Sequence, residues 1–561
     1  MINHILSICL FCILSIGLQS QSDVPDVTST FAIKNANVVV KPGQTIEQAT
    51  VIIKDGLIHQ VGKNIPIPYD AEVINADSMF VYAGFIAGIS HIGIPKKEEK
   101  KEGGSSSVKG YDPPNDAAGI TPEKTVRSVI KPSDSSIAAM RKLGFTMAHV
   151  VPRGGMMAGK GSLISLSGGS VDELLVKENM SLYGSLKAAK NRIYPSTAIG
   201  VMSKWREMYQ QAELAIDHES TFKSAPSGLK RPMYDASTKA LYAATNKSIP
   251  VFFNAPKTLD LSRSLRLQKD LGFNIVASNV KQAYKLKDKI KSMNIPVVIS
   301  LKLPKEEKKK KESDDKKSNK EDDMSDEMKK LLARSSAAKK EYTSQAAILE
   351  EANIPFSISL TDVKAADIQK NLRRMIEAGL SEDKALAALT TNPAQLLGIS
   401  SIAGSIEKGK VANLIVTDTT YFKEKANVLY VFADGKKFKQ EIKKKKKKKE
   451  GDPDAEIVLE GEWTLSINAD GMVIGGNVTI QKTDDGYTGS MTTDMDDEET
   501  EFDSVEVDGS NVTIKMTGDV NGVEAPIQID VVIDGSDMEG SVNIANGMMT
   551  ADVTGSKDDN P

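Results

Sequence analysis

The chain has 561 residues, 40% of them hydrophobic and 26% charged, and a formal net charge of −3 at pH 7. This length predicts several folded units, and the hydrophobic content excludes a chain that stays disordered. The charge is divided unevenly, because residues 451–561 hold 26 acidic and only 3 basic side chains. Such a shift in composition indicates a separate acidic unit that follows a basic one.

An apolar run covers residues 5–18. It has the length of the hydrophobic part of a signal peptide and is too short to span a bilayer. We therefore expect residues 1–20 to be removed and the mature protein to be exported, to the periplasm or the outside of the cell. Both cysteines, Cys9 and Cys12, lie in this run. The mature protein would then have no disulfide, no thiolate nucleophile and no cysteine metal ligand.

Short β-type runs separated by turns make up residues 29–84, for which we predict a small β-sandwich. Asp55 and Gly56 stand between VIIK and LIHQV, a pattern typical of a tight hairpin. From residue 85 to residue 402, apolar runs such as FTMAHVVP, IPVFFNAP and IPVVISL alternate with amphipathic helical stretches. This alternation favours an α/β fold, and its length favours a (β/α)8 TIM-like barrel over an open sheet.

A charged insertion at residues 304–345 interrupts the barrel pattern, and its first part, 304–330, predicts a solvated loop. Two helices follow. Gly379 is expected to end the first helix and Ser381 to cap the second. Short strands then return at residues 403–440.

A lysine-rich segment at residues 441–455 predicts a linker, with contact to anionic polymers or lipid headgroups as the alternative. Residues 456–561 contain eight short runs in which polar and apolar residues alternate. Their regular spacing predicts an all-β domain, either an up-and-down barrel or a sandwich.

Two segments carry a resemblance to a known family. VYAGFIAGISHIGIP, residues 81–95, is similar to the PGFIDxHxHxG segment through which members of the amidohydrolase superfamily, which are metal-dependent hydrolases, enter their first barrel strand. AGLSEDKALAALTTNPAQLLGISSIAGSIEKGKVANLIVTD, residues 378–418, resembles the end of their barrel and its return to the β-sandwich. YPSTAIGVMSKWREMYQQAE and VKQAYKLKDKI are similar to parts of the exported bacterial imidazolonepropionase-like group. The resemblance covers residues 31–440 and implies a composite sandwich made of residues 29–84 and 403–440.

Hydrolysis of an amide at neutral pH needs an activated water and a positive charge for the oxyanion, and a divalent metal such as zinc supplies both. The resemblance implies that ligands would lie at barrel strand ends. His91 matches the second histidine after strand 1, and Asp362 in ISLTD matches the aspartate after strand 8. The other recognised ligand positions carry different residue types: Ile89, Asn254 and Asn279, or Ser278 with a shift of one residue. We identify no strand-4 ligand, so the metal site is largely replaced.

The roles of His91 and Asp362 follow from the resemblance, which makes Asp362 a general base or ligand and His91 a ligand or acid. On their own, His91 could instead bond a backbone carbonyl at the barrel mouth, and Asp362 could cap a helix or join an ion pair. His149 would lie in a barrel strand and could point inward. His59 and His218 have no partner at metal-ligand spacing.

The segment from Gly154 to Lys160 has the GxxxxGK spacing of a phosphate loop, but Gly161 stands where that loop needs Ser or Thr. SLISLSGG also predicts a strand there, not a helix. We therefore expect neither nucleotide nor nucleic acid as a partner. Gly155 and Lys160 would instead belong to a loop at the barrel mouth that contacts a substrate.

Two functions stay open. The first is a hydrolase of carbon–nitrogen bonds other than peptide bonds, with a small amide or lactam as substrate. The second is a noncatalytic pseudoenzyme, a binding or assembly protein with a protein or peripheral-membrane partner, working as a homo- or hetero-oligomer. The replaced ligands favour the second and the family resemblance favours the first, since a barrel alone fixes no function.

Overall fold

A computed structural model describes residues 29–96, 110–189, 193–304, 326–440 and 457–557, the last range with short gaps at 470–471, 485, 495, 520–523 and 545–548. The chain divides into two units, residues 1–442 and 443–561. The expected signal peptide and the linker at 441–455 lie outside the described residues. None of the helices in the described ranges is long and apolar enough to cross a membrane.

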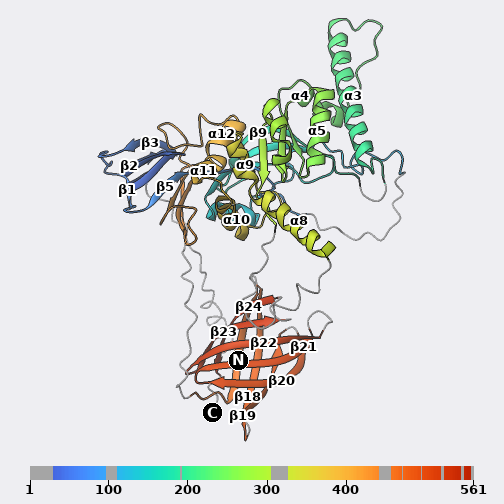
Figure 1. Cartoon of the computed structure of the whole chain (residues 1–561). Coiled ribbons are helices and arrows are strands. Elements are labelled where there is room, and N and C mark those ends of the chain that lie inside the picture. The colour runs from blue at the N-terminus through green and yellow to red at the C-terminus, as the bar shows by residue number, and fades with distance from the viewer. Residues whose placement is uncertain are drawn as a thin grey trace, which may run out of the picture. The chain divides into compact units, whose positions relative to one another are not determined.

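One eight-stranded sheet joins the two ends of the first unit (Figure 1). Its strand order is β16-β15-β14-β5-β1-β2-β3, and β4 pairs with the first part of β1. The strands are β1 (Thr30–Lys41), β2 (Gln44–Lys54), β3 (Leu57–Gly62), β4 (Glu72–Asn75), β5 (Phe80–Ala83), β14 (Leu414–Thr417), β15 (Val428–Ala433) and β16 (Lys436–Lys439). The sheet folds over its own core, because the rings of Phe31 and Phe432 meet edge to face with centroids 5.4 Å apart. Asp55 and Gly56 form the expected hairpin turn, both with positive φ.

The middle of the chain forms a closed eight-stranded barrel, which confirms the predicted TIM-like fold class. Around the barrel the order is β6-β7-β8-β9-β10-β11-β12-β13. Their bounds are β6 (Phe85–Ser90), β7 (Phe145–Val150), β8 (Met157–Ser165), β9 (Leu175–Ser185), β10 (Val251–Asn254), β11 (Ile275–Val280), β12 (Val297–Ser300) and β13 (Phe356–Ser359). The strands β6, β7, β11, β12 and β13 have four to six residues and are wholly buried, as expected for strands covered on both faces, whereas the longer β9 is partly exposed over its first half.

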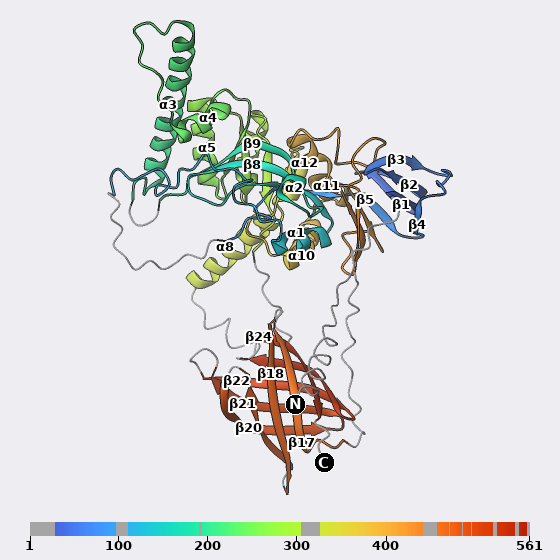
Figure 2. The same ribbon diagram turned by 180° about the vertical axis from the view of Figure 1, so that it is seen from behind.

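One barrel strand departs from the (β/α)8 pattern. β8 pairs antiparallel with both β7 and β9, and Figure 2 shows it beside β9. Residues 151–156 connect β7 to β8, and so short a connection allows only an antiparallel return, since a parallel crossover needs a dozen residues or more. The expectation that Lys160 lies in a loop was therefore wrong, because Lys160 lies inside β8 and faces Leu182 of β9.

Helices surround this barrel, with α3 extending well beyond its neighbours (Figure 1). They are α1 (Ser135–Lys142), α2 (Val171–Leu174), α3 (Ala198–Ser224), α4 (Ala236–Thr245), α5 (Thr258–Leu271), η1 (Ala283–Leu286), α6 (Lys287–Ser292), α8 (Asp326–Thr343), α9 (Gln345–Glu351), α10 (Ala365–Glu377), α11 (Glu382–Leu389) and α12 (Thr391–Leu396). Ser381 caps α11 as predicted, its side chain accepting a hydrogen bond from the Lys384 backbone N–H.

The charged insertion is only partly described, since residues 305–325 lie outside the described ranges. Its second part, including residues 326–330 that we expected in a solvated loop, forms helix α8. Met, Leu, Ala, Lys and Glu are strong helix formers and make up most of this sequence, so the local propensity explains the difference. Tyr342 near the end of α8 donates a hydrogen bond of 2.6 Å to the Lys302 carbonyl and so ties the helix to the barrel.

Apolar side chains fill the barrel interior, among them Ile89, Met147, Phe252 and Val298. Ala394 and Leu397, from α12 and just after it, belong to the same cluster. α12 lies at the N-terminal strand ends, because Asn392 donates a hydrogen bond of 2.8 Å to the carbonyl of Phe356, the first residue of β13. That end of the barrel is therefore covered by α12.

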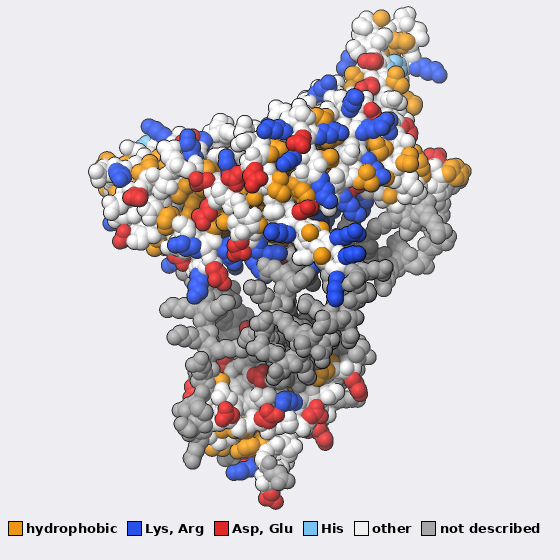
Figure 3. All heavy atoms as spheres, in the orientation of Figure 1, with side chains coloured by type: hydrophobic (Ala, Val, Ile, Leu, Met, Phe, Trp, Pro, Cys, Tyr) orange, Lys and Arg blue, Asp and Glu red, His pale blue; other side chains and the backbone are white. Residues whose placement is uncertain are grey.

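The second unit is a closed barrel in which each strand pairs antiparallel with the next and β24 pairs with β17. This resolves the two predicted alternatives in favour of a barrel. The strands are β17 (Gly461–Ala469), β18 (Met472–Thr483), β19 (Gly486–Thr493), β20 (Asp496–Asp508), β21 (Asn511–Asp519), β22 (Glu524–Asp534), β23 (Asp537–Ile544) and β24 (Met549–Lys557). Trp463, Ile514 and Ile529 are among its buried core residues. In Figure 3 acidic side chains predominate on the visible face of this unit, whereas Lys and Arg are abundant on the first unit.

Candidate functional site

Polar side chains gather at the C-terminal ends of the barrel strands. Three of them occupy paired positions on adjacent strands: Ser185 on β9, Asn254 on β10 and Ser278 on β11. The Asn279 amide donates a hydrogen bond of 3.2 Å to Asn254 Oδ1, and its own Oδ1 accepts one of 3.3 Å from Ser359 Oγ. Of the two strand-6 candidates, Asn279 therefore joins the polar network. The Ser278 hydroxyl is buried without a hydrogen-bond partner among the described residues.

His91 follows β6 and is half-buried at this end of the barrel. Its Nδ1 lies 2.8 Å from the Val151 carbonyl oxygen, which can only accept, so Nδ1 carries the hydrogen and Nε2 is left as an acceptor. Burial and the nearby Arg153 charge lower the pKa of His91 to about 4. The imidazole is consequently neutral at pH 7, and the predicted role of His91 as an acid is not supported by this geometry.

Asp362 follows β13 and is exposed, with a left-handed backbone at φ 59°. The N-cap of α10 is Lys364, so Asp362 does not cap this helix and that alternative was wrong. The negative charge of its carboxylate affects the pKa values of titratable groups at three other strand ends. It favours the charged forms of His91, Arg153 and Lys281, opposing the lowering of their pKa values by burial.

Four mouth residues went unnoticed in the sequence: Arg153, Tyr183, Lys187 and Lys281. Each of the three cations stands one to three residues past the end of a barrel strand, and that position was the available signal. Tyr183 lies in β9, where its ring meets that of His91 edge-on at a centroid distance of 6.1 Å. Burial and the Asp362 charge raise the pKa of Tyr183, so its hydroxyl stays protonated and can donate a hydrogen bond.

The other histidines lie away from this mouth or inside the barrel wall. His59 is exposed on β3, and His218 lies on α3. His149 is fully buried, with Nε2 2.8 Å from Ser181 Oγ and Nδ1 3.2 Å from the Gly88 carbonyl oxygen. The inward orientation considered for His149 is correct, and both ring nitrogens are already hydrogen-bonded.

Gly155 lies in the loop between β7 and β8, where its predicted place in a mouth loop holds. A Cβ atom at this position would stand 2.5 Å from the Gly119 Cα, so only glycine permits this close approach of two backbones. The glycine is thus explained by packing, and substrate contact by Gly155 or Lys160 stays a prediction.

The residues at the strand ends do not fit a catalytic zinc, which takes three protein ligands. Ile89 is fully buried among apolar side chains, and the Asn254 carbonyl oxygen is engaged by Asn279. His91 has a free Nε2, but the positive charges of Arg153 and Lys187 oppose a further cation there. Among the described residues no group of three His, Cys, Asp or Glu side chains could hold a metal ion.

Comparison with known proteins agrees with the fold. An amidohydrolase from Thermotoga maritima superposes with a TM-score of 0.60 at 22% identity, over 73% of this chain and all of that chain. Lower similarity is found to a putative prolidase from Bifidobacterium longum, with a TM-score of 0.42 at 15% identity over 73% of this chain and 94% of the other. A β-aspartyl dipeptidase from Fervidobacterium islandicum gives a TM-score of 0.38 at 13% identity, over 74% and 97% of the two chains. No curated protein sequence matches.

The barrel and its composite sheet lie in the part of the chain that superposes on the Thermotoga maritima amidohydrolase. Residues 276–438, which run from β11 to β16, match the profile of the Amidohydrolase family. The matched part includes the second of the two segments that resemble this family, residues 378–418.

Proposed function

We propose that the protein is a hydrolase of carbon–nitrogen bonds other than peptide bonds, which acts on a small amide or lactam at the barrel mouth without a zinc centre of the family type. The position of Asp362 carries this proposal. Its carboxylate acts electrostatically on His91, Arg153, Tyr183 and Lys281, which come from four different barrel strands or their ends. A base and several donors thus converge where barrel enzymes bind their substrates.

The chemistry needs no group that these residues lack. Asp362 would take a proton from a water molecule as the water oxygen adds to the amide carbonyl carbon. The Arg153 guanidinium and the Lys281 ammonium would stabilise the negative charge that develops on the carbonyl oxygen. The protonated Asp362 would return its proton to the leaving nitrogen as the carbon–nitrogen bond breaks, giving a carboxylic acid and an amine. His91, through its Nε2 lone pair, would accept a hydrogen bond from the substrate N–H.

A noncatalytic binding protein is the second candidate, and a specific observation favours it. Two family ligand positions are integrated into other structure: Ile89 into the apolar interior and Asn254 into a hydrogen bond with Asn279. Residues that pack and pair in this way keep the barrel closed but supply no strong nucleophile or base. The two candidate functions differ in whether the protein hydrolyses a substrate with Asp362 as the base.

Turnover by the purified full chain would separate them. A panel of N-acyl amino acids, dipeptides, lactams and cyclic ureas is incubated with the protein, with and without a chelator. The hydrolase requires turnover that survives the chelator and falls at least about 100-fold in Asp362→Asn, the range typical of losing a general base. Asp367→Asn, an exposed change in the first turn of α10, is the matched control and should keep activity within about threefold. An inactive wild-type protein would favour the noncatalytic function, whereas equal rates for the two variants would refute the role of Asp362 as the base.

The site of action is proposed to be outside the cytoplasm, supported by the apolar run at residues 5–18. Cell fractionation should find a shortened protein in the periplasm or medium, and Leu14→Arg should retain the full-length chain inside. A full-length cytoplasmic protein in both cases would refute export.

A further inference from the structure

A cleft of about 990 Å³ opens beside the barrel mouth. It is lined by residues after β6, by the segment before α1, by the β7–β8 loop and by residues after β9. Five cationic side chains line it: Lys96, Lys124, Lys131, Arg153 and Lys187. Neither Asp nor Glu is present among its described lining residues. A concave wall of one charge sign concentrates the electric field and attracts anions.

None of these five cations forms a salt bridge with a described carboxylate, although the Asp134 and Asp362 carboxylates are near enough to Arg153 to favour its charged form. Arg153 Nε donates a hydrogen bond of 3.2 Å to the Ile94 carbonyl, and Lys187 Nζ donates one of 3.2 Å to the Gly154 carbonyl. Both side chains are thereby held at the wall, and the two terminal nitrogens of Arg153 have no hydrogen-bond acceptor among the described residues. A free guanidinium fork is well suited to a carboxylate.

Apolar groups lie between the charges, including Ile94, Pro95, Val129, Pro152 and Ala188. A ligand that fills the cleft therefore needs several anionic groups joined by an apolar framework. Inorganic phosphate lacks such a framework. Single-stranded nucleic acid usually stacks its bases on aromatic side chains, and the described lining has none.

One part of the cleft wall is fixed by backbone contacts. Gly119 and Gly155 bring two backbone segments so close that a Cβ atom on either residue would stand within 2.8 Å of the other backbone. Met157 N–H donates a hydrogen bond of 3.1 Å to the Gly119 carbonyl, which fixes the same two segments. Rigid walls keep the cost of ordering the site on binding low.

We infer that this cleft binds an acidic peptide, whose Asp or Glu side chains pair with Lys124, Lys131 and Arg153 while its backbone and methylene groups cover the apolar floor. Peptide carboxylates on flexible side chains can reach cations that are spread across a cleft of this size, which is at the upper end of small-molecule pockets. The assignment shares Arg153 with the proposed hydrolase, but it requires binding and no turnover, so the variant at Lys124 and Lys131 tests it separately.

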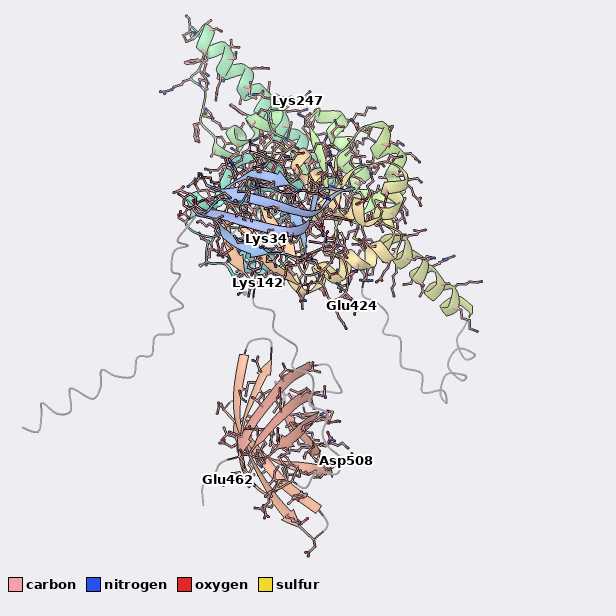
Figure 4. The ribbon with its side chains drawn as sticks, turned by 90° about the vertical axis from the view of Figure 1, so that its left-hand side faces the viewer. Lys34, Lys142, Lys247, Glu424, Glu462 and Asp508 are labelled. Carbon is pink, nitrogen blue, oxygen red and sulfur yellow. The ribbon has the colours of Figure 1, made fainter. Side chains whose placement is uncertain are left out.

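Fluorescence anisotropy with a labelled hexaglutamate peptide tests the inference on the full chain. We expect saturable binding that weakens as salt rises, and none to hexaglutamine. The double variant Lys124→Gln/Lys131→Gln should weaken hexaglutamate binding at least about tenfold, since it removes two charge-assisted hydrogen bonds to peptide carboxylates. The matched double variant Lys142→Gln/Lys247→Gln removes the same charge from exposed sites outside the cleft, labelled in Figure 4, and should bind within about twofold of the wild type.

Three results would overturn the assignment. Equal losses in the two double variants would indicate a general charge effect. Unchanged affinity in both would place binding on other lysines, such as those at 443–449. Tighter binding of an oligothymidylate of equal charge through Lys124 and Lys131 would make the cleft a nucleic-acid site. Circular dichroism of each variant keeps misfolding distinct from lost binding.

Discussion

Acid should destabilise the barrel through His149, whose surroundings favour the neutral ring. Burial lowers the pKa of His149 to about 4, against an ordinary value near 6.5. Between these two pH values the unfolded chain takes up a proton at this histidine and the folded chain does not. Stability linked to His149 is therefore intact above pH 6.5, is lost as the pH falls toward 4, and changes no further below that.

The size of this loss follows from the difference in pKa. A pKa of about 4 in the folded chain, against about 6.5 in the unfolded chain, corresponds to roughly 3 kcal/mol in total, and about 2 kcal/mol of it falls between pH 7 and pH 5. Removing the histidine removes the dependence. His149→Gln should be less stable than the wild type at pH 7, because the hydrogen bond to Ser181 Oγ is disturbed, yet it should lose about 2 kcal/mol less on going to pH 5.

Urea unfolding measured by tryptophan fluorescence can follow the barrel alone. The chain has two tryptophans, Trp205 in the first unit and Trp463 in the second, so a Trp463→Phe background leaves Trp205 as the reporter. His59→Gln, an exposed change on β3, is the control and should keep the pH dependence of the wild type. If His149→Gln and the control lose the same stability between pH 7 and pH 5, the burial argument is wrong.

Four further predictions concern packing, metal binding and independent folding. Trp205 is fully buried against Tyr and Phe rings, so Trp205→Ala should cost about 3–5 kcal/mol in urea unfolding, and a cost below 1 kcal/mol would contradict this packing. Gly155→Ala should cost about 2 kcal/mol and weaken hexaglutamate binding, because its methyl group meets backbone across the cleft wall; a neutral effect would refute that contact. Ile89→His together with Asn254→His should raise the zinc content found by elemental analysis above that of the wild type, since two imidazoles are added beside His91, although Arg153 and Lys187 still oppose the cation; no gain would mean that these positions do not face one point. A fragment of residues 451–561 should unfold cooperatively, because its barrel closes around its own core, and a gradual transition would show that it needs the first unit.

Local sequence patterns were enough to predict most of the fold. The barrel strands are short apolar runs between turn signals, and the Asp55–Gly56 hairpin has a turn sequence with one preferred geometry. The first half of β8 was harder to predict than the second, because Gly159 and Gly161 argue against a strand when read locally. The folded barrel explains both glycines: a Cβ atom at 159 would stand 2.4 Å from the Lys124 carbonyl oxygen, and one at 161 would stand 2.5 Å from His149 Nε2.

The candidate site was less accessible to sequence reasoning. His91 and Asp362 were found because they match a family pattern. Arg153, Lys187 and Lys281 resemble ordinary surface cations in the sequence, and only closure of the barrel brings their strand ends together. The positive charge at the barrel mouth therefore depends on how the strands are arranged, and no short sequence motif predicts it.

The composite sheet also constrains how the protein can be synthesised. β5 pairs with β14, so the strand at residues 80–83 must wait until residues 414–417 have left the ribosome. β6 likewise cannot complete its pairing before β13 is made. A growing chain therefore carries unpaired strand edges through most of its translation, a state prone to aggregation. Truncated products should be insoluble until the last strands of the sheet are present, and the cell must protect this chain for longer than one whose neighbouring strands are consecutive.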